Sequence, residues 1–341
     1  MKRCCTSSIP MRSSRTRWAM AVAAMALLGC ALLSLCVGAV ALSPGQVWQA
    51  LTGRATGAVR QICLLVRLPR TIAAVLAGAA LSVSGLILQT VLNNALAGPN
   101  IIGVNAGAGL FTLLLAAFFP SLLLFTPLAA MLGALVATLL IYFIASATGA
   151  SRMTLVLAGI AISSFLGAMT DTVLTLVPEA QTSRMSFMIG GLSGVYMRQM
   201  LPAMAVIAAG MLLAFVLRKQ MNVLMLGDEV ATSLGLRTRA VRFALLLAAA
   251  MLAGGAVSFA GLLGFIGLIV PHAARFLIGY DQKALVPLCA LLGAAFTLLC
   301  DLLSRVLFAP YEIPVGIVLS FIGGPFFLML LLRQKRGRLY D

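Results

Sequence analysis

The sequence predicts an all-α protein that crosses a membrane about ten times, and three observations support this. Hydrophobic residues make up 62% of the 341 residues and charged residues only 9%, whereas soluble domains are near half apolar and a quarter charged. Long uncharged runs recur along the whole chain. These runs are continuous rather than alternating, which favours helices over the strands of a membrane barrel.

The predicted spans follow from runs of about 20 apolar residues, the length that crosses a bilayer as a helix. Proline punctuates them: Pro69 stands just inside a helix start, and Pro99, Pro178 and Pro310 fall in connections. Pro271 and several glycines predict a kink or a non-helical stretch in the eighth span. The spans are 18–42, 69–92, 104–119, 127–147, 153–177, 199–217, 239–259, 262–279, 284–304 and 314–332.

The domain organisation is therefore one transmembrane domain, 18–332, between tails 1–17 and 333–341. Leu27-Leu28-Gly29-Cys30 resembles a lipoprotein processing site. The apolar run continues past it to Leu42, however, so we expect an uncleaved first span. The seven cysteines show no CxxC spacing, and most lie in apolar runs, which predicts ordinary buried thiols.

The excess of 24 Lys and Arg over eight Asp and Glu is explained by its distribution across the membrane rather than by nucleic acid. With the N-terminus in the cytoplasm, the predicted inner side holds 17 of the 24 cations and the outer side holds seven. Both termini are thus predicted to be cytoplasmic. The seven outer cations are Arg54, Arg60, Arg67, Arg70, Arg184, Arg198 and Arg305.

An internal repeat relates the second and seventh spans. Residues 77–86 read AGAALSVSGL and residues 253–262 read AGGAVSFAGL, with six of ten positions identical. An offset of five spans means that the two copies run in opposite directions, and inverted repeats recur in transporters. The alternative is that both are small-residue faces of the kind that any helix bundle uses for close packing.

No catalytic constellation is visible, so we expect no enzyme activity and no bound cofactor. The one histidine, His272, has no plausible metal-binding cluster around it, and no lysine follows a glycine, which excludes a Walker A loop. If ATP drives this protein, another chain binds it.

The predicted inner loop 226–236 reads LGDEVATSLGL and favours a short amphipathic helix. Asp228 and Glu229 suit the first turn, and Gly235 is a typical C-terminal stop. Such a helix fits a groove in a soluble partner, or it lies on the bilayer surface; both interpretations stay open at this point. Val230, Ala231 and Leu234 give the helix an apolar face. The residues assigned to the function of this loop are Leu226, Gly227, Asp228, Glu229, Ala231, Leu234 and Gly235.

Two groups of charged residues are unusual for spans. Arg67 and Arg70 stand at the start of the second span, where cations oppose the helix dipole, so an acidic partner or lipid phosphate should compensate them. Arg305 follows Asp301 by four residues, and a local ion pair is one explanation for it. Asp171 lies inside the fifth span, which favours a water-filled pathway over a purely structural hydrogen bond.

These motifs, taken together, resemble the FecCD-type permease family of bacterial ABC importers over roughly residues 42–336. The matching stretches are RLPR (67–70), GAALSVSG (78–85) with Gln89, LAGP (96–99), GVNAGA (103–108), Gly190-Gly191, the 226–236 loop, GFIGLIVPH (264–272) with Arg275, and EIPVG (312–316). One departure is Asn94-Ala95-Leu96-Ala97, where the family usually has Asn-Pro-Leu-Ala.

The resemblance implies ten helices per subunit in the bacterial inner membrane, and a second permease subunit beside this one. It also implies two cytoplasmic ATPase subunits and an extracytoplasmic binding protein. The 226–236 loop would dock on the ATPase, and Arg67, Arg70 and Arg305 would meet acidic residues of the binding protein. Asp171, Gln89 and Asn105 are the expected pathway residues. The cargo would be an iron–siderophore complex, haem or cobalamin; an ion-driven secondary transporter and a scaffold without transport are the alternatives.

Overall fold

The computed structural model describes residues 9–38, 40–147, 152–309 and 311–337. Pro310, Cys4, Cys5 and the ends of both predicted tails lie outside this part of the chain. The described residues form helices and no strands. Among them, seven helices are long and apolar enough to cross a membrane, and three shorter apolar helices accompany them. The all-α polytopic architecture predicted from the sequence is confirmed.

The ten principal helices follow the predicted spans. They are α1 (Ile9–Cys36), α4 (Leu68–Val91), α5 (Val104–Phe118), α6 (Thr126–Ala147), α7 (Arg152–Leu176), α9 (Met197–Leu224), α11 (Thr238–Ala260), α12 (Ile266–Ile278), α13 (Gln282–Val306) and α14 (Val315–Gly337). Short helices join them: α2 (Pro44–Leu51), α3 (Gly57–Gln61), α8 (Gln181–Ile189) and α10 (Asp228–Ser233). A π-helical stretch, Ile62–Arg67, leads from α3 into α4.

Helix α1 begins at Ile9 rather than residue 18, and α14 ends at Gly337 rather than residue 332. Three further boundaries differ from the prediction for local reasons. The first span ends at Cys36 rather than residue 42, because Ser43 caps a separate helix, α2, that has proline at its start. Helix α9 continues to Leu224 rather than residue 217, because the polar residues 218–220 are good helix formers. The predicted eighth span is helical only from Ile266, and residues 261–264 form a non-helical segment before it.

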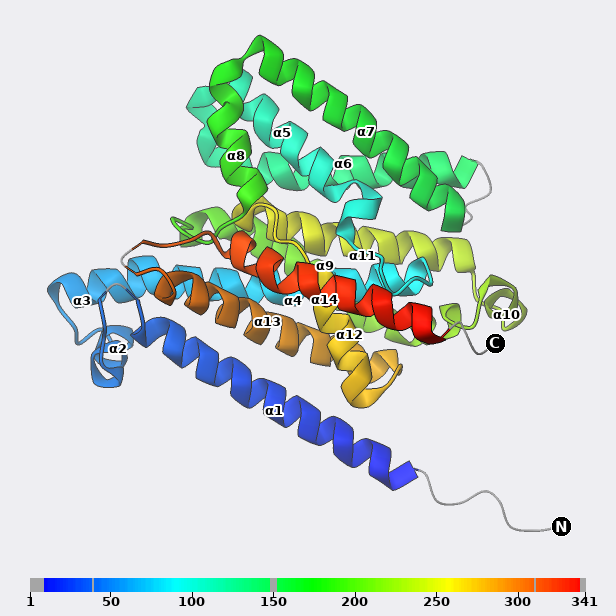
Figure 1. The fold of residues 1–341 in the computed structure, drawn as a ribbon, viewed down its shortest axis with the longest axis horizontal. Coiled ribbons are helices and arrows are strands. Elements are labelled where there is room, and N and C mark those ends of the chain that lie inside the picture. Colours follow the sequence, from blue (N-terminus) through cyan, green and yellow to red (C-terminus); the bar gives the residue numbers. More distant parts are fainter. Residues whose placement is uncertain (1–8, 39, 148–151, 310, 338–341) are drawn as a thin grey trace.

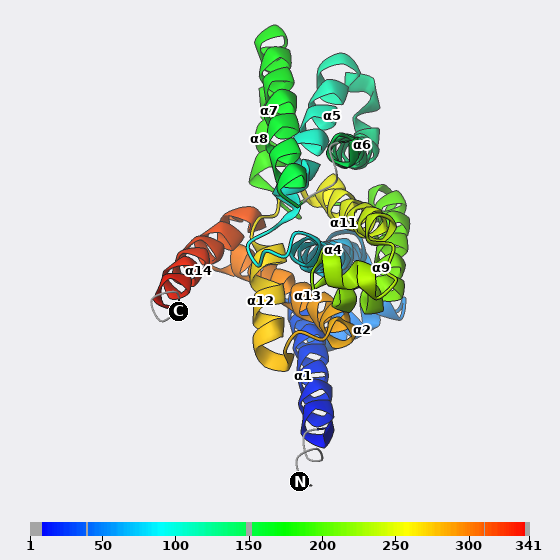
Figure 2. The ribbon, with the colours of Figure 1, turned by 90° about the vertical axis from the view of Figure 1, so that its right-hand side faces the viewer.

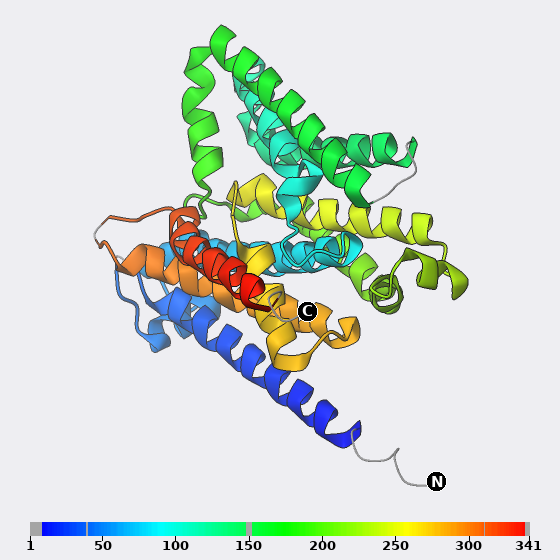
Figure 3. The same ribbon diagram turned by 45° about the vertical axis from the view of Figure 1, so that its right-hand side comes forward.

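Helix α4 occupies the centre of the bundle, with α9, α11, α12 and α13 around it (Figure 2). Helices α5–α8 form a layer on one side, and α1 lies along α13 on the other (Figure 1). The short helix α10 lies beyond the ends of α9 and α11 (Figure 3). We name the two ends of the bundle by a feature at each: the Arg70 end, where α4 begins, and the α10 end, where α9 finishes and α11 begins.

Glycine lets other helices approach α4 to backbone distance. A Cβ atom on Gly78 would overlap the carbonyl oxygen of Gly293 in α13, and one on Gly85 would overlap that of Gly267 in α12. Close approach of this kind is typical of membrane bundles, where small residues replace the hydrophobic effect as the basis of packing. The two segments of the predicted repeat lie largely in α4 and α11, which pack side by side. Their inverted relationship stays a prediction.

Candidate functional site

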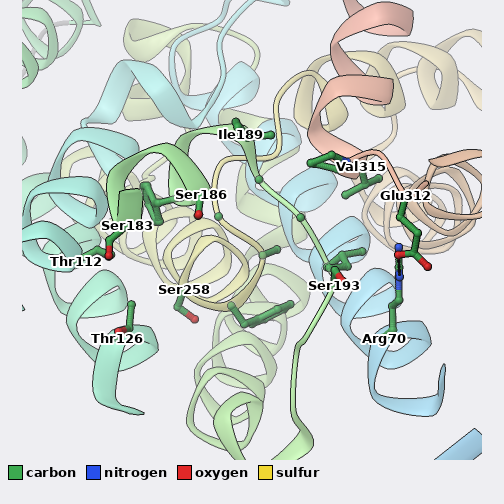
Figure 4. A pocket seen from close by; sticks show the side chains of 18 of the residues that line it. Arg70, Thr112, Thr126, Ser183, Ser186, Ile189, Ser193, Ser258, Glu312 and Val315 are labelled. Carbon is green, nitrogen blue, oxygen red and sulfur yellow. Dashed lines mark hydrogen bonds and ion pairs between the residues drawn. The ribbon is translucent and has the colours of Figure 1, made fainter. Parts of the chain in front are cut away.

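A cavity of about 450 Å³ opens at the Arg70 end, between the core helices and the α5–α8 layer. Figure 4 shows Thr112 and Ser183 on one side of it and Arg70 with Glu312 on the other. The polar side chains that line it are Arg70, Thr112, Thr126, Ser183, Ser186, Ser193, Ser258 and Glu312. Apart from the single ion pair, these groups are hydroxyls, which can donate and accept hydrogen bonds to a polar solute.

The hydroxyl of Thr112 in α5 is a buried group of this lining that has no hydrogen-bond partner in the described part of the chain. The residue is 5% exposed. A buried hydroxyl without a partner costs free energy, and a bound solute or water in the cavity can recover it. Ser258, in contrast, donates to the carbonyl oxygen of Gly255 at 2.7 Å.

Irregular backbone forms the floor of the cavity and is held by hydrogen bonds between distant segments. The N–H of Gly191 donates to Ala260 and that of Leu262 to Phe187, both at 2.9 Å. The N–H of Gly316, in the first turn of α14, donates to Gly190 at 3.2 Å. Non-helical backbone at membrane depth is tolerated where its polar groups are paired inside the protein or line a cavity.

Arg70 belongs to a buried ion cluster at the edge of the cavity. Its Nε lies 2.9 Å from Oδ1 of Asp301, which is fully buried in α13, and its Nη1 lies 2.6 Å from Oε2 of Glu312. Arg305 lies 3.0 Å from the other oxygen of Asp301, in ion-pair contact but without hydrogen-bond geometry. Two guanidinium groups and two carboxylates thus balance each other where helices α4 and α13 meet.

Two of the arginines also hold the end of α1. The guanidinium group of Arg67 donates to the carbonyl oxygens of Leu35, Cys36 and Val40. Arg305 donates to the carbonyl oxygen of Ser34 at 3.1 Å. Carbonyl groups in the last turn of a helix lack partners and carry the negative end of its dipole, so cations stabilise them.

These contacts identify partners for the three arginines within the chain. Arg67, Arg70 and Arg305 are only 5%, 7% and 6% exposed. An acidic partner or lipid phosphate was expected to compensate them, and within the chain Asp301, Glu312 and the end of α1 already do so. That these arginines meet a binding protein stays a prediction. The local pair between Asp301 and Arg305, one of the sequence-based interpretations, is confirmed.

The three expected pathway residues lie in different places. Asp171 is on the exposed face of α7, where Oδ1 accepts from Nη1 of Arg184 at 3.0 Å. Asn105 lines a second cavity of about 380 Å³, bordered also by Pro99 and Phe327. Gln89 is 3% exposed, donates to the carbonyl oxygen of Gly267 at 3.0 Å, and borders neither of these two cavities.

At the opposite end, the 226–236 loop forms the short helix that the sequence predicted. Gly227 and Gly235 flank α10 with left-handed backbone, at φ values of 102° and 82°. Both carboxylate oxygens of Asp228 accept from Nη2 of Arg242 in α11, each at 2.8 Å. Ala231 is buried against the bundle, whereas Glu229 and the apolar side chains of Leu226, Val230 and Leu234 are exposed. The helix is thus anchored by one acidic residue and presents an apolar edge.

Comparison with known proteins agrees with this architecture. The profile of the FecCD transport family matches residues 18–333. The Hemin transport system permease protein HmuU of Yersinia pestis is 39% identical over 315 residues, which cover 90% of this chain and 93% of that protein. The Iron(3+)-hydroxamate import system permease protein FhuB of Bacillus subtilis is 38% identical, over 90% of this chain and 81% of its own.

A solved structure has the same fold. It is an ABC transporter, assigned to the metal-chelate type, in an inward-facing conformation. It superposes with a TM-score of 0.81 at 27% identity and covers 93% of this chain and 99% of its own. Since the family profile and both permease sequences span nearly the whole chain, the protein is an integral membrane permease component that belongs to the FecCD transport family.

Proposed function

We propose that this chain is the membrane-spanning subunit of an ATP-driven importer that carries an iron–siderophore complex or a similar metal chelate, such as haem or cobalamin, into the cytoplasm. It works as one of two permease subunits. Two ATPase subunits bind at the α10 end, and an extracytoplasmic binding protein delivers the cargo at the Arg70 end. The names of relatives, which refer to hemin, iron(3+)-hydroxamate and achromobactin transport, support a chelate as cargo.

The observation that carries this proposal is the shape of the 226–236 loop. Leu226, Val230 and Leu234 are 59%, 46% and 64% exposed on a helix that Asp228 fixes to Arg242. Apolar side chains that are held in a fixed array are suited to a groove in a soluble partner. A conformational change that ATP binding or hydrolysis causes in the ATPase subunit is then transmitted to the permease through α10.

The Arg70 end supports the delivery step in a modified form. Because the chain neutralises its own buried arginines, docking involves Glu312, whose side chain is 39% exposed, and exchange of ion pairs within the cluster. A carboxylate of the binding protein competes with Glu312 for Arg70. Docking is thereby coupled to residues 312–315, which border the cavity. Exposed pairs of this kind affect docking rate and register more than affinity.

The alternative function is a secondary transporter driven by an ion gradient, and Asp171 is the residue that favours it. Its side chain is 72% exposed on a predicted span but is paired with Arg184. A gradient-driven mechanism gives the anchored α10 helix no partner, so we rank it second.

Reconstitution tests the proposal directly. The full-length chain is placed in proteoliposomes with its ATPase subunits and binding protein, and radiolabelled iron is supplied as hemin or as a ferric hydroxamate. We expect accumulation that requires ATP and is lost with a hydrolysis-deficient ATPase subunit. Accumulation by the permease alone, driven by a proton or sodium gradient, would establish the alternative instead. The Asp171→Asn variant separates the two further, because only a gradient-driven mechanism requires its charge.

A further inference from the structure

A polar cluster at the α10 end joins helices α9, α13 and α4 just before the 226–236 loop. Asn222 lies in the last turn of α9, and its Nδ2 donates to Oδ1 of Asp281 at 2.8 Å. Its Oδ1 accepts from the backbone N–H of Gln282 at 2.9 Å. The amide fits in one orientation only, because the reverse would set its NH2 group against an N–H and its oxygen against a carboxylate. Both polar atoms of the Asn222 side chain therefore form hydrogen bonds with residues at the start of α13.

Gln282 extends this contact into the core. The residue is fully buried, and its Nε2 donates to Oγ1 of Thr90 in α4 at 3.3 Å and lies 3.0 Å from Sδ of Met225. Met225 directly follows α9 and precedes the α10 loop. The ends of α9 and α4 therefore meet at the start of α13.

Helices α4 and α13 are tied to each other along their whole length. Arg70 and Asp301 pair at the opposite end of the two helices, 2.9 Å apart. Between the ends, Ser82 donates to the carbonyl oxygen of Cys289 at 2.7 Å, and Gly78 packs against Gly293. Because contacts join α4 and α13 at both ends and in the middle, we expect the two helices to move together as a rigid pair.

We propose that Asn222 is a positioning residue that couples the α10 loop to the α4–α13 pair, so that displacement of α10 is transmitted to the ion cluster and cavity at the Arg70 end. The inference rests on the proposed function, because it concerns how ATP-driven motion is passed on. Capping of α13 accounts for only one of the two bonds of Asn222: its Oδ1 caps the N–H of Gln282, but its Nδ2 also donates to Asp281 and so ties the end of α9 to the residue that caps Lys283.

Exchange of the two side chains provides the test. In Asn222→Asp, the new carboxylate still accepts from the N–H of Gln282, but it faces the carboxylate of Asp281, so the bond between the two side chains is lost. In Asp281→Asn, the matched control, the new amide oxygen still accepts from Asn222 and from Lys283, so the contact is kept although the charge is removed. In the double variant, Asn222→Asp with Asp281→Asn, the new amide at position 281 donates to the new carboxylate at position 222, so the bond between the two side chains forms again. The N–H of Lys283 then loses its acceptor, because the same oxygen of Asp281 accepts from Asn222 and from Lys283.

The measurement is iron taken up per ATP hydrolysed in the reconstituted complex, with hemin or ferric hydroxamate as cargo, whichever the wild type accumulates. We expect Asn222→Asp to lower this ratio by about threefold, because it replaces a hydrogen bond to a carboxylate with repulsion between two carboxylates. Asp281→Asn and the double variant should stay near the wild-type ratio. Asn222→Ser, which removes the contact without adding charge, replaces Asn222→Asp if that variant does not insert.

The outcomes are distinguishable. No ATP-dependent uptake by the wild type overturns the proposed function and this inference with it. A wild type that works, beside an Asn222→Asp variant with an unchanged ratio, overturns the inference alone. A low ratio that the double variant does not restore also overturns it, because the effect then does not depend on the contact with Asp281. A purely structural role would lower the amount of protein in the membrane and leave uptake per ATP unchanged.

Discussion

Asp301 is the residue on which the ion cluster depends most, and Asp301→Asn tests that directly. Its carboxylate is fully buried and lies 2.9 Å from Nε of Arg70 and 3.0 Å from Nη2 of Arg305. At an effective dielectric constant near 20, each contact is worth between about 5 and 6 kcal/mol of Coulomb energy. Removing the charge also relieves the several kcal/mol that its desolvation costs, which leaves a net loss of about 3 kcal/mol.

The assay is reversible unfolding in mixed micelles, followed by far-UV circular dichroism. Asp171→Asn is the matched control: it makes the same chemical change in a pair that is 72% and 31% exposed. Because that pair is largely exposed rather than desolvated inside the bundle, its loss should cost no more than about 1 kcal/mol. If Asp301→Asn unfolds at the same denaturant concentration as Asp171→Asn, the electrostatic account of the cluster is wrong.

Three further predictions concern other parts of the molecule. Asp228→Lys places a cation against Arg242 and should reduce uptake per ATP in the reconstituted complex. Combining Asp228→Arg with Arg242→Asp should restore that uptake. Uptake equal to wild type in the Asp228→Lys variant would contradict the anchoring role of Asp228. Gly316→Ala sets a methyl group against the carbonyl oxygen of Ile189, so the yield of folded protein in membranes should fall well below that of Gly324→Ala, whose Cβ meets open space. Arg67→Gln leaves carbonyl groups at the end of α1 with fewer hydrogen-bond donors and should destabilise the protein by about 1–3 kcal/mol in the same unfolding assay. Arg54→Gln is the control, because Arg54 is exposed, and it should leave the stability unchanged.

The sequence was a good guide to the helices because hydrophobic runs of bilayer length determine them almost alone. Helices α4 and α11 begin and end within one residue of the predicted 69–92 and 239–259. Where the chain leaves this pattern, local capping decides, as at Ser43. The helical stretches 44–51 and 181–189 were missed because they are too short to show a span-length signal.

The candidate site was predictable in part. The 226–236 loop carries its signal locally, in acidic residues at the helix start and glycines at both ends, so its form was predicted correctly. The ion cluster joins Arg70 to partners more than 200 positions away, and no local pattern contains that pairing. Thr112 gave no signal, because a threonine in an apolar helix ordinarily satisfies its hydroxyl with a carbonyl one turn before it.

The crowding of backbone around α4 bears on how such a permease changes its cargo over evolutionary time. A side-chain atom added at Gly78 or Gly85 would overlap the main chain of a neighbouring helix, so these two positions of α4 tolerate almost no substitution. The serine and threonine side chains that face the cavity meet no such obstacle. Laboratory selection for a different cargo should therefore leave Gly78 and Gly85 of α4 unchanged and collect its substitutions along α5, α6 and α8, where a new side chain alters the cavity without moving the central helix.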